Sequence, residues 1–523
     1  MSKPRHTLDD PAVVIIGSGA GGATLAHELC ARGIDVVLLE AGRRIEPAEF
    51  RNDEMFAFGQ LSWLDPRSIS GDWEVAKLSP NLPAWTVKAV GGSTVHWGAL
   101  AYRMQAHEFA PKTHYGNVAG AALADWPLSL DELAPWYDKA EDRLGVTGTH
   151  DIAPLPVANN YKVMWNGATR IGYRQVRNDR HAINSAPRAG RSACLQLGFC
   201  TSGCKSSAKW STLYTEIPAA EATGRLDLRT GAMALRIEHD AAGKVNAVVY
   251  ADAAGVQQRQ RARLVCVAGN GIETPRLLLN SESARFAHGL ANGSGLVGRH
   301  FMKHVNALVF GRFDKPVHME RGPVASGTVY DEARLDTSRG FAGGYLLQSA
   351  HVGLPSFGIA VKPGAWGAQF ARWVDHYPNL AGVWLNGEDL PLADNTVGLD
   401  EARKDAHGMR VAHLHIDDHA NDRAMRAHFV RQARLLLGAA GAREYLECPP
   451  FPASHTLGTA RMSKDAGAGV VNAFGRSHEI ANLFVSDGSQ FVSASAQNPT
   501  LTIVALALRQ AEHIAGLMSR REL

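Results

Sequence analysis

The chain has 523 residues, of which 45% are hydrophobic and 20% are charged, so it is long enough for a large core and for two or more domains. The net charge is +3 and no basic tract stands out, which argues against a nucleic-acid-binding protein. No apolar run is long enough to cross a membrane. The first apolar stretch, Val13–Ile16, runs straight into Gly17 and does not form the core of a signal peptide.

The N-terminal residues predict a strand–helix–strand unit. Ala12–Ile16 has the pattern of a buried strand, Gly21–Arg32 that of a helix stopped by Gly33, and Asp35–Glu40 that of a second strand. Such a unit places two parallel strands side by side, so the fold is predicted to begin as a doubly wound α/β domain.

A glycine fingerprint, Gly17-x-Gly19-x-x-Gly22, stands between the first strand and the helix, and Glu40 closes the second strand. The first glycine permits a tight turn, and the second lets the backbone approach a pyrophosphate. The third allows the helix to pack closely on the strand, and the acid accepts a ribose hydroxyl. A glycine-rich turn that binds nothing is the alternative, but it leaves Glu40 unexplained. The sequence therefore predicts a dinucleotide site.

The rest of the chain alternates irregular stretches with further elements. Residues 45–90 are rich in Trp and Pro and suggest an excursion over a cofactor. Further strands are predicted at Leu226–Arg229, Ala234–His239, Val245–Tyr250, Leu264–Ala268, Gly343–Gln348 and Met409–Ile416. Further helices are predicted near Thr274–Leu279, from an N-cap at Asp417-Asp418 to about Gly438, and over Pro499–Met518.

Three cysteines form a second motif. Cys194, Cys200 and Cys204 occupy the first, third and fourth places of the bacterial ferredoxin run C-x2-C-x2-C-x3-C, and Leu197 fills the second place. Three thiolates at this spacing suit a cluster that lacks one iron, [3Fe–4S]. A zinc site short of one ligand and a set of unconnected buried thiols are the alternatives.

Five motifs, spread in order over almost the whole chain, resemble those of the glucose–methanol–choline (GMC) oxidoreductase family. They are Leu38-Leu39-Glu40-Ala41-Gly42, Gly91-Gly92-Ser93-Thr94-Val95-His96-Trp97, Asn270-Gly271-Ile272-Glu273-Thr274-Pro275, His455-Thr456-Leu457-Gly458-Thr459, and Asp487-Gly488-Ser489 followed by Asn498-Pro499. The resemblance implies an α/β fold in which a Rossmann-like domain, assembled from several segments, binds FAD and an α+β domain with its own sheet binds the substrate.

For this chain the resemblance implies an FAD-binding domain at residues 1–130, 205–305 and 450–523. A connecting region at 131–204 would carry the cysteines, and a substrate domain would span 306–449. The residues implied to bind FAD are Gly17, Gly19, Gly22, Glu40, Gly91, Gly92, Ser93, His96, Trp97, Ala234, Asp487, Gly488, Asn498, Pro499 and Thr500.

The family's catalytic pair matches His455 and Asn498 position by position. A neutral imidazole can take the proton of an alcohol while the carbon hydrogen leaves as hydride to the flavin N5 atom. Asn498 is also a good N-cap for a helix that begins at Pro499, and such a helix would aim its positive end at the reduced flavin. His96 stands where some family members attach the flavin covalently; its structural alternative is ring packing beside Trp97.

The cysteine segment is similar to that of the flavoprotein subunits of bacterial glucose, fructose and gluconate dehydrogenases, where three such cysteines hold a [3Fe–4S] cluster. Two residues depart from the family pattern. Lys205 follows the last cysteine where proline is common, and Lys303 stands where Asp is frequent in the segment Gly298–His304.

The resemblance implies a dehydrogenase that oxidises a hydroxyl of a sugar or related alcohol and passes electrons from FAD through the cluster to a cytochrome or quinone. It also implies a small partner subunit that carries the export signal, and a periplasmic or membrane-associated place in the cell, with the cytoplasm as the alternative. An oxidase that uses dioxygen is the second interpretation. A lyase with a structural FAD is the third, and it leaves the three cysteines unexplained.

Overall fold

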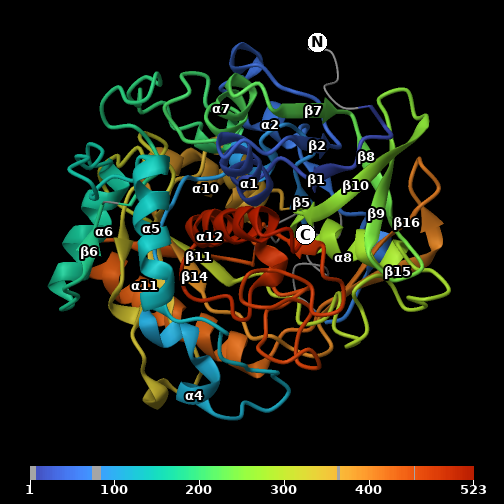
Figure 1. The fold of residues 1–523 in the computed structure, drawn as a ribbon. Coiled ribbons are helices and arrows are strands. Elements are labelled where there is room, and N and C mark those ends of the chain that lie inside the picture. The colour runs from blue at the N-terminus through green and yellow to red at the C-terminus, as the bar shows by residue number, and fades with distance from the viewer. Residues whose placement is uncertain (1–6, 73–83, 179, 362–364, 451, 453) are drawn as a thin grey trace.

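The computed structural model describes residues 7–72, 84–178, 180–361, 365–450, 452 and 454–523. Two sheets organise this part of the chain (Figure 1). One is mainly parallel and is built from segments near both ends and the middle of the chain, whereas the other is antiparallel and draws mostly on the later half.

The mainly parallel sheet begins with the predicted unit. Strands β1 (Ala12–Ile16) and β2 (Val36–Glu40) are buried along their whole length and flank helix α1 (Ala20–Ala31). The strand order is β7 (Leu226–Thr230), β2, β1, β10 (Gln257–Val267) and β18 (Leu483–Val485), with parallel pairing throughout. The doubly wound α/β beginning is confirmed.

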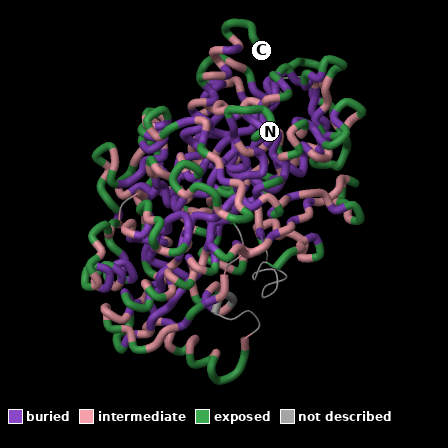
Figure 2. Tube along the Cα trace, turned by 90° about the horizontal axis from the view of Figure 1, so that it is seen from below, coloured by how far each residue is buried: buried purple, intermediate pink, exposed green. Residues whose placement is uncertain are grey.

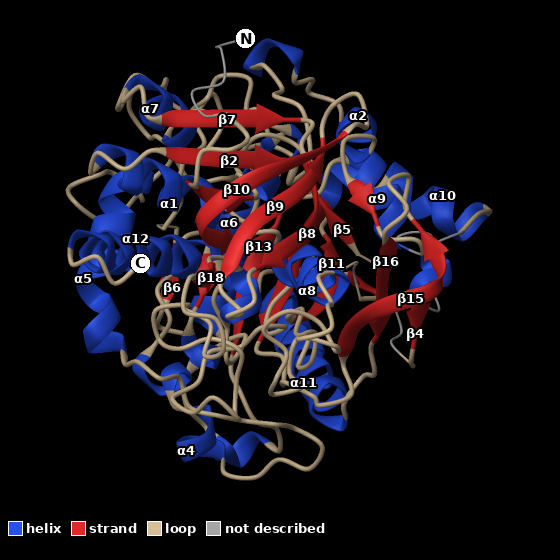
Figure 3. Cartoon of the chain, turned by 45° about the vertical axis from the view of Figure 1, so that its right-hand side comes forward, coloured by secondary structure: helices blue, strands red, loops and turns tan. Residues whose placement is uncertain are grey.

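Strand β10 is longer than the predicted Leu264–Ala268. Its first residues, 257–261, pair antiparallel with β9 (Val245–Ala251), which in turn pairs with β8 (Met233–His239). This half of β10 is polar and partly exposed because it extends beyond the core, so the apolar pattern reveals only the buried half. Figure 3 shows β7, β2, β10, β9 and β8 as neighbouring arrows.

The antiparallel sheet has six strands. Their order is β17 (Glu444–Cys448), β11 (Val305–Arg312), β14 (Leu380–Gly387), β13 (Tyr345–Ala350), β12 (Thr328–Val329) and β6 (Val176–Arg177). Alternate residues of β11, β13 and β14, such as Val309, Leu347 and Val383, pack against α6 (Asn159–Arg170) and α11 (Ala420–Ala439). The residues between them face the opposite side of the sheet, toward the cofactor cavity described below.

The prediction that Asp417-Asp418 caps helix α11 is wrong. His419 is the N-cap: its Nδ1 accepts from the Asn421 N–H, and the Asp422 carboxylate accepts from the His419 N–H. Asp418 is instead paired with Arg426 of the helix, and a carboxylate held there is not free to cap.

Helix α12 (Thr500–Ser519) is the most apolar long helix of the described residues. Its length and mean hydropathy would allow it to cross a membrane, but 61% of its most apolar stretch is buried inside the protein. It packs against α1 and α5 (Leu130–Leu144), which makes it a core helix of the parallel-sheet half (Figure 1). Figure 2 shows buried residues gathered in the interior of the molecule and exposed ones at its outer loops.

The remaining elements are α8 (Asn270–Asn280), which follows β10, and several shorter ones. The short helices are α2 (Glu54–Phe58), α4 (Pro111–Tyr115), α7 (Glu216–Ala222), α9 (Leu354–Val361) and α10 (Ala368–Asp375). A small sheet joins β15 (Thr396–Lys404), β16 (Arg410–His415) and β4 (Ile69–Ser70), and β3 (Ser62–Trp63) pairs with β5 (Trp85–Thr86).

Candidate active site

A cavity of about 550 Å³ lies between the two sheets, within the size range of small-molecule and cofactor sites. Most of the residues predicted to bind FAD or to act in catalysis line it. They are Gly17, Gly19, Glu40, Gly92, Ser93, His96, Trp97, Ala234, His455, Asp487, Gly488, Asn498, Pro499 and Thr500. Gly22 and Gly91 do not line it.

The fingerprint glycines have the geometry that a dinucleotide site needs. A Cβ on Gly19 would meet nothing within 4 Å, so this residue lies open at the N-terminus of α1. A Cβ on Gly22 would lie 2.0 Å from the Gly17 oxygen, which shows that this glycine allows close contact of helix and turn. The free N–H groups at this helix end provide the donors for a pyrophosphate.

Glu40 is buried at the end of β2. Its carboxylate accepts from the Ser18 N–H at 3.0 Å, the Ser18 hydroxyl at 2.6 Å and the Gly42 N–H at 2.9 Å. Ser18 Oγ also accepts from the Gly91 N–H at 3.0 Å. Gly91, with φ of +99°, thus does not line the cavity itself but joins its loop to the glycine fingerprint through this hydrogen bond.

Asp487 joins the other segments around the cavity. Its two carboxylate oxygens accept from the Asn270 N–H and the Thr274 hydroxyl of α8, and from the Ser489 N–H and hydroxyl, at 2.5–2.8 Å. The N-termini of α1, α8 and α12 all meet the same cavity. The first N–H groups of α8 are bonded to Asp487, Thr456 and Asn270, so it is the N-termini of α1 and α12 that favour an anionic ligand. These residues fit FAD.

His455 and Asn498 line the cavity together, and each has a partner that the sequence did not reveal. His455 Nδ1 lies 3.2 Å from Nδ1 of His304, with the two rings edge to face at 4.8 Å. The Oδ1 atom of Asn498 accepts from Gln348 Nε2 at 2.7 Å.

The prediction that Asn498 caps the last helix is wrong. Helix α12 begins at Thr500 with Pro499 as its N-cap residue, and no side chain caps it. The Asn498 amide is instead hydrogen-bonded by Gln348, because β13 and the start of α12 line the same cavity.

Both histidines are neutral in the folded protein. Burial, followed by the nearby His304, holds the pKa of His455 well below its usual value. Burial also lowers the pKa of His304 to about 4, against the opposing effect of nearby backbone carbonyls. A neutral imidazole has one lone pair and can act as a base.

His96 also lines the cavity as a neutral ring. Its Nδ1 lies 2.9 Å from the Thr201 carbonyl oxygen, and burial lowers its pKa to about 4. Nδ1 therefore carries the hydrogen, and Nε2 is buried with no protein partner in the described part of the chain. Trp97 donates from Nε1 to the Trp210 oxygen at 2.9 Å, and the two indoles contact each other edge to face.

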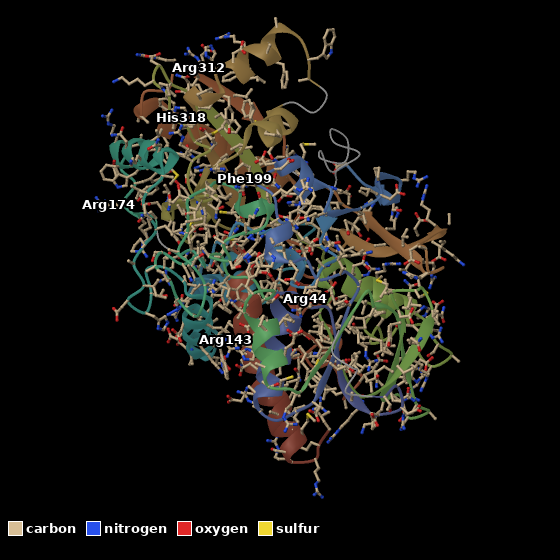
Figure 4. The ribbon with its side chains drawn as sticks, turned by 90° about the horizontal axis from the view of Figure 1, so that it is seen from above. Arg44, Arg143, Arg174, Phe199, Arg312 and His318 are labelled. Atoms are coloured by element: carbon tan, nitrogen blue, oxygen red, sulfur yellow. The ribbon has the colours of Figure 1, made fainter. Side chains whose placement is uncertain are left out.

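The cysteine segment lies against the cavity wall. Thr201 and Ser202, which line the cavity, stand between Cys200 and Cys204. The buried Lys209 ammonium donates to the oxygens of Val95, Trp97 and Cys200 at 2.5–2.9 Å, so one side chain joins the segment to the loop that carries His96. A Cβ on Gly198 of this segment would lie 2.4 Å from the Glu320 oxygen, so the segment packs closely on the turn that follows His318; Figure 4 labels Phe199 and His318.

The thiols have N–H donors and one cation nearby, in a buried setting. The Gln196 and Lys209 N–H groups donate to the sulfurs of Cys194 and Cys204 at 3.4 Å each. Burial raises the pKa of Cys194 to about 11. Burial also raises the pKa of Cys200, and the charge of Lys209 partly opposes that rise. N–H donors and a nearby cation both stabilise thiolate sulfur.

The three sulfurs do not form a compact single-ion site. Within the described residues, the group of three metal-ligating side chains whose ligand atoms all lie within 4.8 Å is Asp138, Glu141 and His150. Arg103 and Arg180 already pair with the acids of that group. One zinc ion would draw thiolates closer than this limit, because each Zn–S bond is only about 2.3 Å. The three sulfurs are therefore not gathered around one point among the described residues.

The residues that sequence reasoning missed lie mainly on the antiparallel sheet. Asn306, Gln348, Trp384 and Asn386 line the cavity, and Asn306 pairs with Asn386 while Gln348 pairs with Trp384 across strands. The sequence signal for these residues is a polar side chain within an otherwise apolar strand, which indicates a strand face that lines a polar cavity. His304 is the last residue of the segment Gly298–His304. Lys303, which precedes it, is buried beside the Asp389 carboxylate.

The fold and the cavity are those of a dinucleotide-dependent enzyme, and a histidine and an amide, His455 and Asn498, line the cavity together. Two family models described as GMC oxidoreductase match residues 12–306 and 391–507. The chain belongs to the GMC oxidoreductase family, and it is an FAD-dependent oxidoreductase that acts on CH–OH groups.

Similar proteins include both dehydrogenases and an oxidase. The chain is 32% identical to 2-methyl-1,2-propanediol dehydrogenase of Mycolicibacterium austroafricanum, over 98% of this chain and 96% of the relative. It is 31% identical to paromamine 6'-oxidase of Streptomyces fradiae, over 98% and 94%. It is 28% identical to the fructose dehydrogenase large subunit of Gluconobacter japonicus, over 96% and 97%.

Proposed function

We propose that this protein is a dehydrogenase that oxidises a hydroxyl of a sugar, glycoside or related alcohol, and that its electrons leave through a [3Fe–4S] cluster held by Cys194, Cys200 and Cys204. The observation that carries the proposal is the place of the cysteine segment. It lies against the wall of the cofactor cavity, joined through Lys209 and Thr201 to the loop that carries His96.

His455 is the base in this proposal. Its neutral imidazole takes the hydroxyl proton, and Asn498 donates a hydrogen bond from its amide to the oxygen that becomes the carbonyl. Bound FAD supplies the acceptor for the hydride that leaves the same carbon. The substrate thus loses one proton and one hydride, which together are two electrons and two protons.

The cavity wall supports a polyhydroxylated substrate. Asn306, Asn386, His351 and Glu54 offer hydrogen-bonding groups, and four aromatic side chains offer flat apolar faces. The aromatic residues are Phe58, Trp63, Trp85 and Trp384. A sugar ring presents hydroxyls around its edge and C–H groups on its faces, so it matches a wall of this composition.

The cysteine segment also reaches the surface, which supports a relay. Leu195 and Leu197, between the first two cysteines, are 63% and 51% exposed. A cluster at this place would lie between the flavin and the protein surface, and would divide the electron path to an outside acceptor into two shorter steps. We infer that this acceptor is a cytochrome or quinone, and that a small partner subunit carries the enzyme to the periplasm or the membrane.

The experiment is anaerobic reduction of the flavin by a panel of sugars and alcohols, followed by reoxidation with dioxygen, a small dye or cytochrome c. We expect reduction by a sugar, rapid reoxidation by dye and cytochrome, and slow reoxidation by dioxygen. Fast reoxidation by dioxygen would identify an oxidase instead. His455→Ala should slow flavin reduction by about a hundredfold or more, and an unchanged rate would exclude His455 as the base.

The relay is tested by replacing each ligand cysteine with serine, with Cys448→Ser as a buried control outside the segment. Iron content and the EPR signal of an oxidised [3Fe–4S] cluster should fall in the three ligand variants only. Flavin reduction should stay at the wild-type rate, whereas electron delivery to cytochrome c should fall. A wild-type protein without iron would end the relay proposal.

A further inference from the structure

The contact between His455 and His304 restricts where the hydrogens lie. His304 Nε2 lies 3.1 Å from the Gln497 carbonyl oxygen. A carbonyl oxygen can only accept, so the hydrogen of the neutral His304 ring is on Nε2 and its Nδ1 has the lone pair.

The same logic extends to the base. His455 Nδ1 lies 3.2 Å from His304 Nδ1, and two lone pairs at that distance would repel. His455 Nδ1 therefore carries the hydrogen and donates it to His304. The remaining nitrogen of His455, Nε2, is left with the lone pair.

We propose that His304 is a positioning residue that fixes the tautomer of His455, so that Nε2 is always the basic nitrogen that meets the substrate. The proposal rests on His455 being the base. His304 acts as a neutral counterpart of the acid that orients a histidine in hydrolase triads: it accepts from His455 before the reaction and continues to accept when His455 has taken the proton.

The anchor of His304 is backbone, which makes the arrangement rigid. Residue 304 has φ of +66°, a backbone conformation that residues other than glycine rarely adopt. Each ring nitrogen has a hydrogen-bond partner, and the backbone of Ser495 and Ala494 also lies close to the ring. Because the Gln497 carbonyl cannot take a proton onward, His304 orients the base and does not carry its proton away.

A separate hydrogen bond fixes the other half of the pair. Gln348 Nε2 donates to Asn498 Oδ1 at 2.7 Å, so the Asn498 amide presents its N–H₂ group to the cavity. The substrate therefore meets one lone pair and one donor, and we infer that Gln348 orients Asn498 as His304 orients His455.

The test compares two substitutions of His304 in the FAD-loaded full-length protein. His304→Phe keeps the ring volume but removes the acceptor, whereas His304→Asn keeps an oxygen near the place of Nδ1. We expect the anaerobic flavin reduction rate to fall about tenfold or more in His304→Phe, with less than about a threefold change in substrate affinity, and to recover largely in His304→Asn. Equal losses in both variants, or a change confined to affinity, would overturn the proposal.

Two further measurements separate this proposal from the proposed function. In a His455→Ala background, His304→Phe should cause no additional loss, because the tautomer of a missing base has no effect. In ¹⁵N-histidine-labelled wild type, with His455 assigned from its alanine variant, Nδ1 should show the shift of a protonated ring nitrogen. An unprotonated Nδ1 would overturn the role of His304 even if His455→Ala is inactive, and this measurement does not depend on any His304 variant folding.

Gln348 is tested by the same cycle. Gln348→Met should slow flavin reduction by about tenfold in wild type but not in an Asn498→Ala background. A loss of equal size in both backgrounds would mean that Gln348 acts on the substrate directly and not through Asn498.

Discussion

Asn498 has two possible uses that the structure separates. A helix N-cap side chain contributes about 1 kcal/mol when it accepts from the first turn, but the Asn498 amide oxygen accepts from Gln348, and α12 has no side-chain cap. The residue is therefore available for the substrate and does not stabilise the helix.

We predict that replacing Asn498 changes the rate of flavin reduction but not the stability of the protein. Asn498→Ala should slow anaerobic flavin reduction while leaving the melting temperature of the protein nearly unchanged. The control is Ser129→Ala, which removes a true N-cap: Ser129 Oγ accepts from the Glu132 N–H at the start of α5. That variant should lower the melting temperature and leave flavin reduction alone. If Asn498→Ala lowers the melting temperature as much as Ser129→Ala does, Asn498 stabilises the helix start after all and the prediction fails.

Single residues were predictable from sequence where a motif named them and not elsewhere. His455 and Asn498 stand in family motifs and both line the cavity. His304, which directly precedes β11, and Gln348 of β13 reach the pair from positions about 150 residues away in the chain. Contacts of this kind depend on strand register, which a single sequence does not specify.

At the scale of elements, the fingerprint glycines of α1 make a matched pair for experiment. A Cβ on Gly19 would meet open space, while a Cβ on Gly22 would meet the Gly17 oxygen at 2.0 Å. We expect Gly19→Ala to fold with a normal circular dichroism spectrum but to weaken FAD binding, because the methyl group occupies the place where the pyrophosphate approaches. Gly22→Ala should lower the melting temperature of the apoprotein itself. Equal FAD affinity for Gly19→Ala and wild type would contradict this placement.

Helices α1 and α5 are joined by a buried carboxylate whose charge state depends on pH. Burial alone would raise the pKa of Glu28, but the charge of Arg143 and hydrogen bonds from Arg32 and Lys139 outweigh it and lower the pKa to about 2. A lowered pKa contributes stability that is complete above about pH 4.5 and is lost as the pH falls toward 2. The shift corresponds to at most about 3 kcal/mol.

Glu28→Gln should therefore lower the melting temperature clearly at pH 7 and much less at pH 3. Glu221→Gln is the control, because Glu221 pairs with Arg44 at the surface, where ion pairs contribute about 0–1 kcal/mol. A Glu28→Gln effect that stays constant between pH 7 and pH 3 would show that the lost interaction is packing and not charge.

Element prediction succeeded where burial produced a pattern. The first strands, α1 and the final helix match their predicted ranges within a residue or two. The polar half of β10 and the N-cap of α11 were missed, because a strand pairing and a competing ion pair decided them. The β9–β10 pairing and the Asp418–Arg426 ion pair join residues that are close in sequence, but an apolar pattern does not record which polar groups pair.

On the scale of the whole molecule, the chain places an apolar surface at the outer side of the cysteine segment. Lys209 and Thr201 join the inner side of the segment to the cofactor cavity, while Leu195 and Leu197 are exposed on the outer side. If electrons leave here, a protein acceptor must contact this surface, whereas a small dye can react without it.

Replacing both leucines by serine should therefore separate two kinds of acceptor. In Leu195→Ser/Leu197→Ser, electron transfer to cytochrome c should slow several-fold because exposed apolar side chains contribute to docking, while anaerobic flavin reduction and turnover with a small dye should stay at wild-type rates. Leu435→Ser is the control, because Leu435 is similarly exposed, at 58%, but lies on α11. Equal slowing by both variants would mean a general surface effect. No slowing by the double variant would place the exit of electrons on another face of the protein.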